Sequence, residues 1–230
     1  MNAKTPLGIV DLGNWSFQSA APYPWLEPPA PLTLTTPLDL AVYLAQNGTE
    51  AAAALQPRIR ARLASDPQMR SWLRARTYFR DAPEFVKYRK KSRRFNDAAR
   101  AVSAGTATHE QAALVQRLRS EIAMSKVVIS PGQVMFHGRG DRALDSVSPY
   151  PAFVSTSMDA TVALWHAITC AANTSGSPVI YLLRLQSQIQ VLLGHSHHSH
   201  ESEVLLPPDL TYTVIAVHGG SITIVEVDVT

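Results

Sequence analysis

Two glutamates, Glu201 and Glu203, lie two residues apart where a histidine-rich stretch meets an apolar run that ends at Pro207. In a β-strand this spacing directs both side chains to the same face of the sheet. Paired carboxylates suit chemistry at a sugar carbon, because one acid can stabilise an oxocarbenium-like cation while the other moves a proton or orients a nucleophile. A bare pair of this kind is also typical of a solvated strand edge, so the surrounding elements must decide between the two roles.

The elements that would carry these glutamates are short β-type segments, which begin at Val127 and are separated by Gly, Pro and Ser. We predict strands at 127–129, 133–136, 153–155, 179–183, 191–193, 203–206, 212–217 and 222–227. A single helix at 159–172 interrupts them, with apolar residues at helical spacing. Because helices come before the strands, the pattern indicates an α+β fold.

The chain is predicted to consist of an arm and one domain. Residues 1–36 are proline-rich and show neither helical nor strand periodicity, which indicates an extended arm. Residues 37–230 are expected to form the domain, mainly helical over 37–126 and β-rich over 127–230. The arm also carries four aromatic residues, so we expect it to lie against its own domain, with the rim of a cleft as the suggested place. These aromatic residues are Trp15, Phe17, Tyr23 and Trp25.

Helix signals fill the first half of the domain. Pro37 and Asp39 favour a helix start, and Asn47-Gly48 ends that helix. A second helix is predicted at 49–64, a third begins at Asp66-Pro67, and a fourth follows a capped start at 106–111. The basic run 87–94 contains one aromatic residue and could meet nucleic acid, phosphate or an acidic partner. Because no recognition motif accompanies it, a solvated helix face or loop is the favoured interpretation.

Composition limits the class of protein. The chain has 230 residues, 46% of them hydrophobic, which is enough for a sizeable core, and its formal net charge is +3. This small basic excess permits a nucleic-acid partner without implying one, and none is expected. Cys170 is the single cysteine, so an internal disulfide framework is excluded. Neither a membrane-spanning apolar run nor the apolar region of a cleaved signal peptide is found, so we expect no membrane attachment.

Three short motifs follow one another in the second half of the chain. Residues 135–140 (Met-Phe-His-Gly-Arg-Gly) follow a strand, 153–157 (Phe-Val-Ser-Thr-Ser) end a strand before a helix, and 200–208 contain the two glutamates. Together they resemble the mono-ADP-ribosyltransferase family of the arginine-serine-glutamate type. Its strands carry an aromatic-Arg-Gly, a Ser-Thr-Ser and a Glu-x-Glu followed by an apolar run and proline. The resemblance covers roughly residues 110–230.

The resemblance implies a two-sheet, β-sandwich-like core whose cleft holds NAD as a substrate in a bent shape. It implies that Glu203 bonds the nicotinamide ribose and stabilises the developing cation, that Glu201 positions the acceptor, and that Ser155 orients Glu203. Nicotinamide is then expected against backbone groups beside Gly138. The residues expected to bind NAD are His137, Gly138, Arg139, Ser155, Thr156 and Ser157.

The first motif departs from the family pattern, because His137 stands where the family has arginine directly before glycine. His137 resembles instead the histidine of the diphtheria-toxin and poly-ADP-ribose polymerase branch, which bonds the adenosine ribose. Three alternatives stay open: His137 serves a hybrid site, Arg139 reaches the phosphates from a shifted loop, or the NAD site is impaired. The side chains of residues 137 and 139 face the same side only if the strand continues through Gly138.

Four histidines within 195–200 suggest a metal site, since imidazole is a common zinc ligand. They lie in a polar loop with no cysteine nearby, and such a loop positions ligands poorly. We therefore expect a surface loop and no metal. In the family that this chain resembles, the corresponding loop recognises the acceptor protein.

The resemblance implies an NAD-dependent transferase that adds ADP-ribose to a protein, with an arginine side chain as the expected acceptor because Glu-x-Glu accompanies that specificity. It further implies a secreted bacterial effector or toxin that acts in the cytoplasm of a host or rival cell. The alternative is a catalytically impaired interaction module of the same fold. Such a module would hold a partner through the basic run 87–94 or the proline-rich arm.

Overall fold

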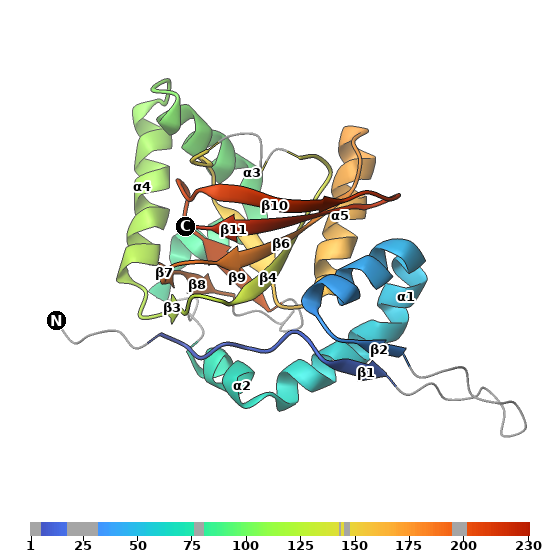
Figure 1. The fold of residues 1–230 in the computed structure, drawn as a ribbon. Helices are drawn as coiled ribbons and strands as arrows, with labels where there is room; N and C mark the ends of the chain where they lie inside the picture. The colour runs from blue at the N-terminus through green and yellow to red at the C-terminus, as the bar shows by residue number, and fades with distance from the viewer. Residues whose placement is uncertain (1–5, 18–31, 76–80, 143, 145–147, 195–201) are drawn as a thin grey trace, which may run out of the picture.

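The computed structural model describes residues 6–17, 32–75, 81–142, 144, 148–194 and 202–230. Helices and strands are mixed in the order that the sequence predicts, with most helices first, so the α+β prediction is confirmed (Figure 1). The helices are α1 Pro37–Ser65, α2 Pro67–Arg74, α3 Pro83–Ser103, α4 His109–Met124 and α5 Ala160–Thr174. Across the described ranges, no helix has the length and apolar character that crossing a membrane requires.

Within the described residues, the strands form one large sheet and two small ones. The large sheet has seven strands in the order β10-β11-β6-β4-β5-β9-β8, while β1 pairs with β2 and β3 pairs with β7. The strand bounds are β1 Trp15–Phe17, β2 Leu32–Leu34, β3 Val128–Ile129, β4 Val134–Arg139, β5 Val154–Ser157, β6 Val179–Leu185, β7 Ile189–Gln190, β8 Leu192–Leu193, β9 Glu203–Leu206, β10 Tyr212–His218 and β11 Thr223–Val229.

The large sheet is nearly divided in two at its centre. β4 pairs with β6 over six residues, but with β5 only through Phe136 and Ser157. β5 then pairs with β9 and β9 with β8, so a four-stranded half and a three-stranded half share one point of contact. The two sheets expected from the resemblance are therefore two halves that diverge beyond Phe136.

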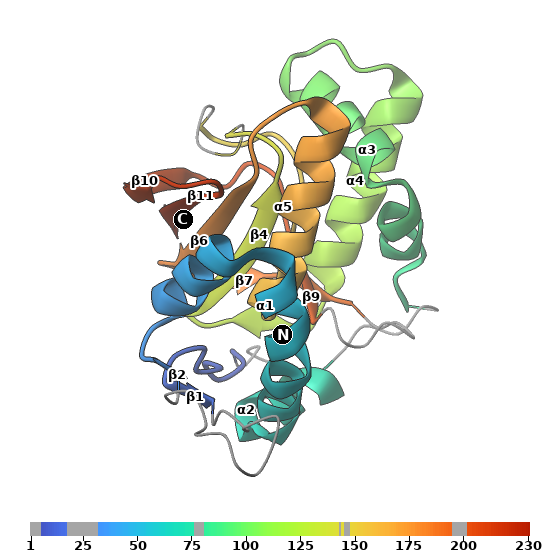
Figure 2. The ribbon, with the colours of Figure 1, turned by 90° about the vertical axis from the view of Figure 1, so that its right-hand side faces the viewer.

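A different set of helices covers each half. α5 packs along β4 and also contacts α1, on one side of the molecule (Figure 2). Gly138 and Gly140 make this approach possible, since a Cβ on Gly138 would lie 1.8 Å from the carbonyl oxygen of Ala163 and one on Gly140 would lie 2.5 Å from the Ala171 nitrogen. α3 and α4 pack together against the other half, in a separate hydrophobic cluster that includes Phe153 and Leu205.

The helix boundaries follow the capping signals. Thr36 accepts a hydrogen bond from the Asp39 backbone in a capping box at the start of α1, and Thr108 does the same for α4. Gly48 has φ +67° inside α1 and breaks it into the two helices that the sequence predicts. The strand pair β1–β2 was not predicted, because its short strands lack a period-two pattern and depend on packing against the domain.

The described parts of the arm are docked on the domain. Trp15 is buried, and Arg62 of α1 lies over its ring at 4.3 Å from the centroid. Gln133 accepts a hydrogen bond from the Val10 backbone at 2.8 Å, and the Trp72 indole donates to the carbonyl of Gly8. These contacts involve α1, α2 and the residue before β4, so this part of the arm does not cover the rim of the cleft as suggested. Of the other aromatic residues of the arm, Tyr23 and Trp25 lie outside the described residues, as does the side chain of Phe17.

Candidate active site

A cleft of about 630 Å³ lies where β4 and β5 diverge. Its volume is in the range of sites that hold a small ligand or a cofactor. α3 closes one side, α5 another, and the ends of β4, β5 and β9 form the floor. Its polar lining includes Arg89, Ser92, Arg93, Asn96 and Arg100 of α3, His137 and Arg139 of β4, Asp141 of the loop after β4, Ser155, Thr156 and Ser157 of β5, His166 of α5, and Glu203 of β9.

Glu203 is held at one end of the cleft by two side chains. Ser155 Oγ donates to Glu203 Oε1 at 2.5 Å, and Arg89 Nε donates to Oε2, also at 2.5 Å. The Arg89 and Glu203 side chains are 17% and 11% exposed, so this ion pair is largely removed from water. Charge-assisted hydrogen bonds on both oxygens fix the direction of the carboxylate.

His137 spans the gap between the two halves of the sheet. Its Nδ1 lies 2.6 Å from the carbonyl oxygen of Ser155, which can only accept, so Nδ1 carries the proton and donates. Burial, reinforced by the positive charge of Arg139, lowers the pKa of His137 to about 3, so the ring is neutral at pH 7. Nε2 is buried, and within the described residues it has no hydrogen-bond partner. The ring therefore presents an unused acceptor.

Arg139 lies on the same side of the sheet as His137. The strand continues through Gly138, because residues 137, 138 and 139 pair in unbroken register with β6. Arg139 Nε donates to Asp141 at 2.8 Å and Nη1 donates to the Tyr150 hydroxyl at 3.0 Å. Burial is the largest influence and lowers the pKa of Arg139, but the hydrogen bond to Asp141 and the charges of Asp141, Tyr150 and Tyr181 together outweigh it, so this pKa lies above its usual value. Arg139 is thus a fixed cation in the cleft.

Arg100 brings a second guanidinium to the Arg139 end of the cleft. Its Nη2 donates to the same Tyr150 oxygen at 3.2 Å, so two cations from α3 and β4 converge. An anion with several oxygens, such as a diphosphate, would neutralise both. The cleft therefore has a carboxylate at one end and a cationic cluster at the other.

The predicted site residues within the described part of the chain all line this cleft. Thr156 and Ser157, however, have structural bonds: Thr156 Oγ1 donates to the Val204 carbonyl at 3.0 Å, and Ser157 Oγ accepts from the Asp159 nitrogen at the start of α5. Their predicted contact with NAD stays a prediction. Glu201 and the histidines of 195–200 lie outside the described residues.

Sequence reasoning missed the contribution of α3. The run 87–94 was interpreted as a solvated helix face or loop, or as a patch that meets nucleic acid, phosphate or an acidic partner, yet Arg89 bonds Glu203 inside the cleft. Arg100, beyond this run, reaches the cleft as well, where it bonds the Tyr150 hydroxyl. The spacing of Arg89, Arg93, Asn96 and Arg100 is a helical signal that places all four on one face, and it could have found them. Nothing in the sequence indicated Tyr150, which lies in the loop between β4 and β5.

Comparison with known proteins defines the fold. No family model and no curated protein matches the sequence, whereas solved structures match the fold of this chain. The ADP-ribosyltransferase Vis, in complex with an inhibitor, matches with a TM-score of 0.50 and 18% identity over 80% of this chain and 86% of that chain. Vis toxin from Vibrio splendidus matches with a TM-score of 0.48 and 17% identity over 80% of this chain and 86% of that chain. Plx2a, an ADP-ribosyltransferase toxin from Paenibacillus larvae, matches with a TM-score of 0.49 and 12% identity over 79% of this chain and 96% of that chain. The match to Vis shows that this chain has the ADP-ribosyltransferase fold.

Proposed function

We propose that this protein transfers ADP-ribose from NAD to an arginine side chain of another protein. The observation that carries the proposal is the polarity of the cleft. Glu203 is fixed at one end by Ser155 and Arg89, and Arg100 and Arg139 lie at the other end. NAD has matching ends, since its diphosphate is anionic and its nicotinamide ribose becomes cationic as the glycosidic bond breaks.

The diphosphate would lie against Arg139 and Arg100, whose guanidiniums offer charged, directional donors. The unused Nε2 of His137 would accept a hydrogen bond from a ribose hydroxyl, in agreement with the hybrid form of the first motif. This arrangement combines two alternatives left open by the sequence, because His137 and Arg139 both face the cleft. Nicotinamide would contact backbone groups beside Gly138.

Glu203 would accept a hydrogen bond from the 2′-hydroxyl of the nicotinamide ribose. A carboxylate has room for this bond beside those from Ser155 and Arg89, since its two oxygens offer about four acceptor sites. As the bond from C1′ to nicotinamide breaks, both bonding electrons leave with nicotinamide and the ribose gains positive charge. The fixed carboxylate stabilises that charge more in the transition state than in the ground state, and this difference accelerates the reaction.

A guanidinium nitrogen of the acceptor would then attack C1′, form the new C1′–N bond and release one proton to water. We assign the positioning of this acceptor to Glu201, two residues before Glu203 on the same chain segment. The motif resemblance supports arginine as the acceptor and a protein as the partner. It also supports the role of a secreted bacterial effector or toxin that acts in the cytoplasm of a host or rival cell.

The test is the release of nicotinamide from labelled NAD, with and without free arginine as acceptor. Glu203→Gln keeps the shape but removes the charge, so hydrolysis and transfer should both fall by roughly 10²- to 10³-fold. Glu201→Gln should spare hydrolysis and abolish transfer. Glu226→Gln is the control, because Glu226 pairs with His218 on β10 and does not line the cleft. Wild-type protein that binds a partner but releases no nicotinamide would favour the interaction module instead.

A further inference from the structure

Tyr150 lies in the connection between β4 and β5 and joins three parts of the molecule. Its backbone nitrogen donates to the carbonyl of Leu210 at 2.8 Å, and its carbonyl accepts from the Asp209 nitrogen at 2.7 Å. Both partners belong to the segment that follows β9. Asp209 is in turn paired with Arg119 of α4. Tyr150 is 3% exposed, and its ring meets that of Tyr212 edge to face with centroids 5.9 Å apart. The position of the Tyr150 side chain is therefore well fixed.

The Tyr150 hydroxyl is the point at which two cations meet. Arg139 of β4 donates to it at 3.0 Å and Arg100 of α3 donates to it at 3.2 Å. Two guanidiniums this close repel each other. The carboxylates that also hold them, Asp141 on Arg139 and Asp97 on Arg100, have side chains that are 52% and 56% exposed, so water weakens both ion pairs. A shared acceptor on a buried ring opposes the repulsion. Tyr150 itself is not among the residues that line the cleft.

We propose that Tyr150 is a positioning residue, which holds the guanidiniums of Arg100 and Arg139 at the spacing and direction needed to meet one diphosphate group. The proposal rests on the proposed function, because it assigns the diphosphate of NAD to this end of the cleft. Preorganised donors bind an anion more tightly than donors that must first be ordered. Tyr150 acts through the two arginines and needs no contact with substrate.

Tyr150→Phe tests this role, because it removes the hydroxyl and keeps the ring. Tyr212→Phe is the matched control: its ring packs edge to face against that of Tyr150, but its buried hydroxyl has no partner among the described residues. The dissociation constants of ADP-ribose and inorganic pyrophosphate would be measured by calorimetry on the full chain. We expect Tyr150→Phe to weaken both ligands roughly tenfold, as for the loss of hydrogen bonds to charged groups. Tyr212→Phe should change neither by more than about twofold on the same scale.

A kinetic measurement separates positioning from a general loss of structure. With NAD, Tyr150→Phe should raise KM and leave kcat unchanged, whereas loss of folded protein would lower the apparent kcat. Should Tyr150→Phe fail to fold, Arg100→Lys provides the second variant. It retains the charge but loses the planar fork, so it should weaken pyrophosphate binding in the same way.

The outcomes separate this proposal from the proposed function. The proposal would be wrong if Tyr150→Phe bound pyrophosphate and ADP-ribose with wild-type affinity, or if Tyr212→Phe weakened their binding equally, because Tyr150 would then contribute packing alone. The proposed function would stand in that case if the protein still consumes NAD. A wild-type protein that binds pyrophosphate in a Tyr150-dependent way but consumes no NAD would support the positioning role and contradict the proposed function. Binding of neither pyrophosphate nor ADP-ribose would contradict both.

Discussion

The two halves of the large sheet differ in how they are supported and in what they bring to the cleft. The half that ends at β4 is backed by α5 at very close range, through Gly138, and contributes the cation Arg139. The half that contains β9 is backed by α3 and α4 and contributes the carboxylate Glu203. Strand pairing joins them only at Phe136 and Ser157. The opposite charges of the cleft therefore come from two units that the sheet itself barely connects.

α3 is the element that spans both units. Near its start Arg89 bonds Glu203 on β9, and near its end Arg100 shares the Tyr150 hydroxyl with Arg139. Lys91 between them has non-helical angles of φ −142° and ψ 41°, so the helix bends along the cleft. The distance between the Glu203 end and the Arg139 end of the cleft therefore depends on α3, and the position of α3 depends in turn on its contacts with α4.

The close packing of the first half gives the largest expected effect. In Gly138→Ala the new methyl group would meet the Ala163 carbonyl at 1.8 Å, so α5 must move away from β4. We expect the free energy of unfolding to fall by roughly 3 kcal/mol or more. Gly219→Ala is the control, since a Cβ there meets nothing within 4 Å. Equal melting temperatures for the two variants would mean that α5 does not depend on this glycine.

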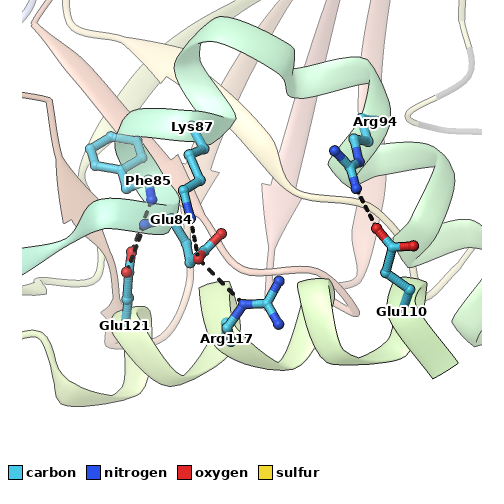
Figure 3. Close-up of polar contacts among 7 residues, drawn as sticks. All are labelled: Glu84, Phe85, Lys87, Arg94, Glu110, Arg117 and Glu121. Atoms are coloured by element: carbon cyan, nitrogen blue, oxygen red, sulfur yellow. Dashed lines mark hydrogen bonds and ion pairs between the residues drawn. The ribbon is translucent and has the colours of Figure 1, made fainter.

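The support of α3 gives the next effect (Figure 3). Ala82 provides no side-chain cap for α3, and Glu121 of α4 instead accepts from the backbone nitrogens of Glu84 and Phe85 at 2.8 and 2.9 Å. Burial raises the pKa of Glu121, while these two bonds oppose that rise. Glu121→Gln weakens the cap, so stability should fall by about 1–2 kcal/mol.

The matched control for the cap is Glu110→Gln on the same helix. Glu110 joins α4 to α3 through Arg94, but its side chain is 78% exposed, so its loss should cost less than about 0.5 kcal/mol. Chemical denaturation of both variants makes the comparison. A cost for Glu121→Gln as small as that of Glu110→Gln would show that α3 is held by its apolar contacts alone.

The junction of the halves gives the smallest effect, which depends on pH. The pKa of His137 falls from 6.5 to about 3 on folding, so the unfolded chain binds more protons between these values and stability is lost as pH falls below 6.5. Between pH 6.5 and pH 5 the loss should be on the order of 1 kcal/mol. Thermal melting across this range should show a weaker pH dependence in His137→Gln. A dependence that is unchanged in this variant would mean that other groups cause it.

The elements that carry the chemistry could be predicted from sequence, since the proline and glycine boundaries and the apolar alternation are local signals. The strand 203–206 has the predicted bounds, and the helix after Ser157 begins one residue later than expected. The partners of these elements could not be predicted. Arg89 and Glu203 are 114 residues apart, and their contact depends on how α3 packs on the sheet. The direction of the Arg139 side chain could not be predicted either, because glycine at position 138 allows the strand to continue or to end there.

The central claim is that Glu203 acts on the transition state, whereas Arg139 acts on binding. The most direct measurement is the NAD concentration dependence of nicotinamide release by Glu203→Gln and Arg139→Gln, side by side. For Glu203→Gln we expect kcat to fall by roughly 10²-fold or more with little change in KM. For Arg139→Gln we expect KM to rise by about tenfold or more while kcat is retained. The same pattern in both variants, or full activity in Glu203→Gln, would contradict the claim.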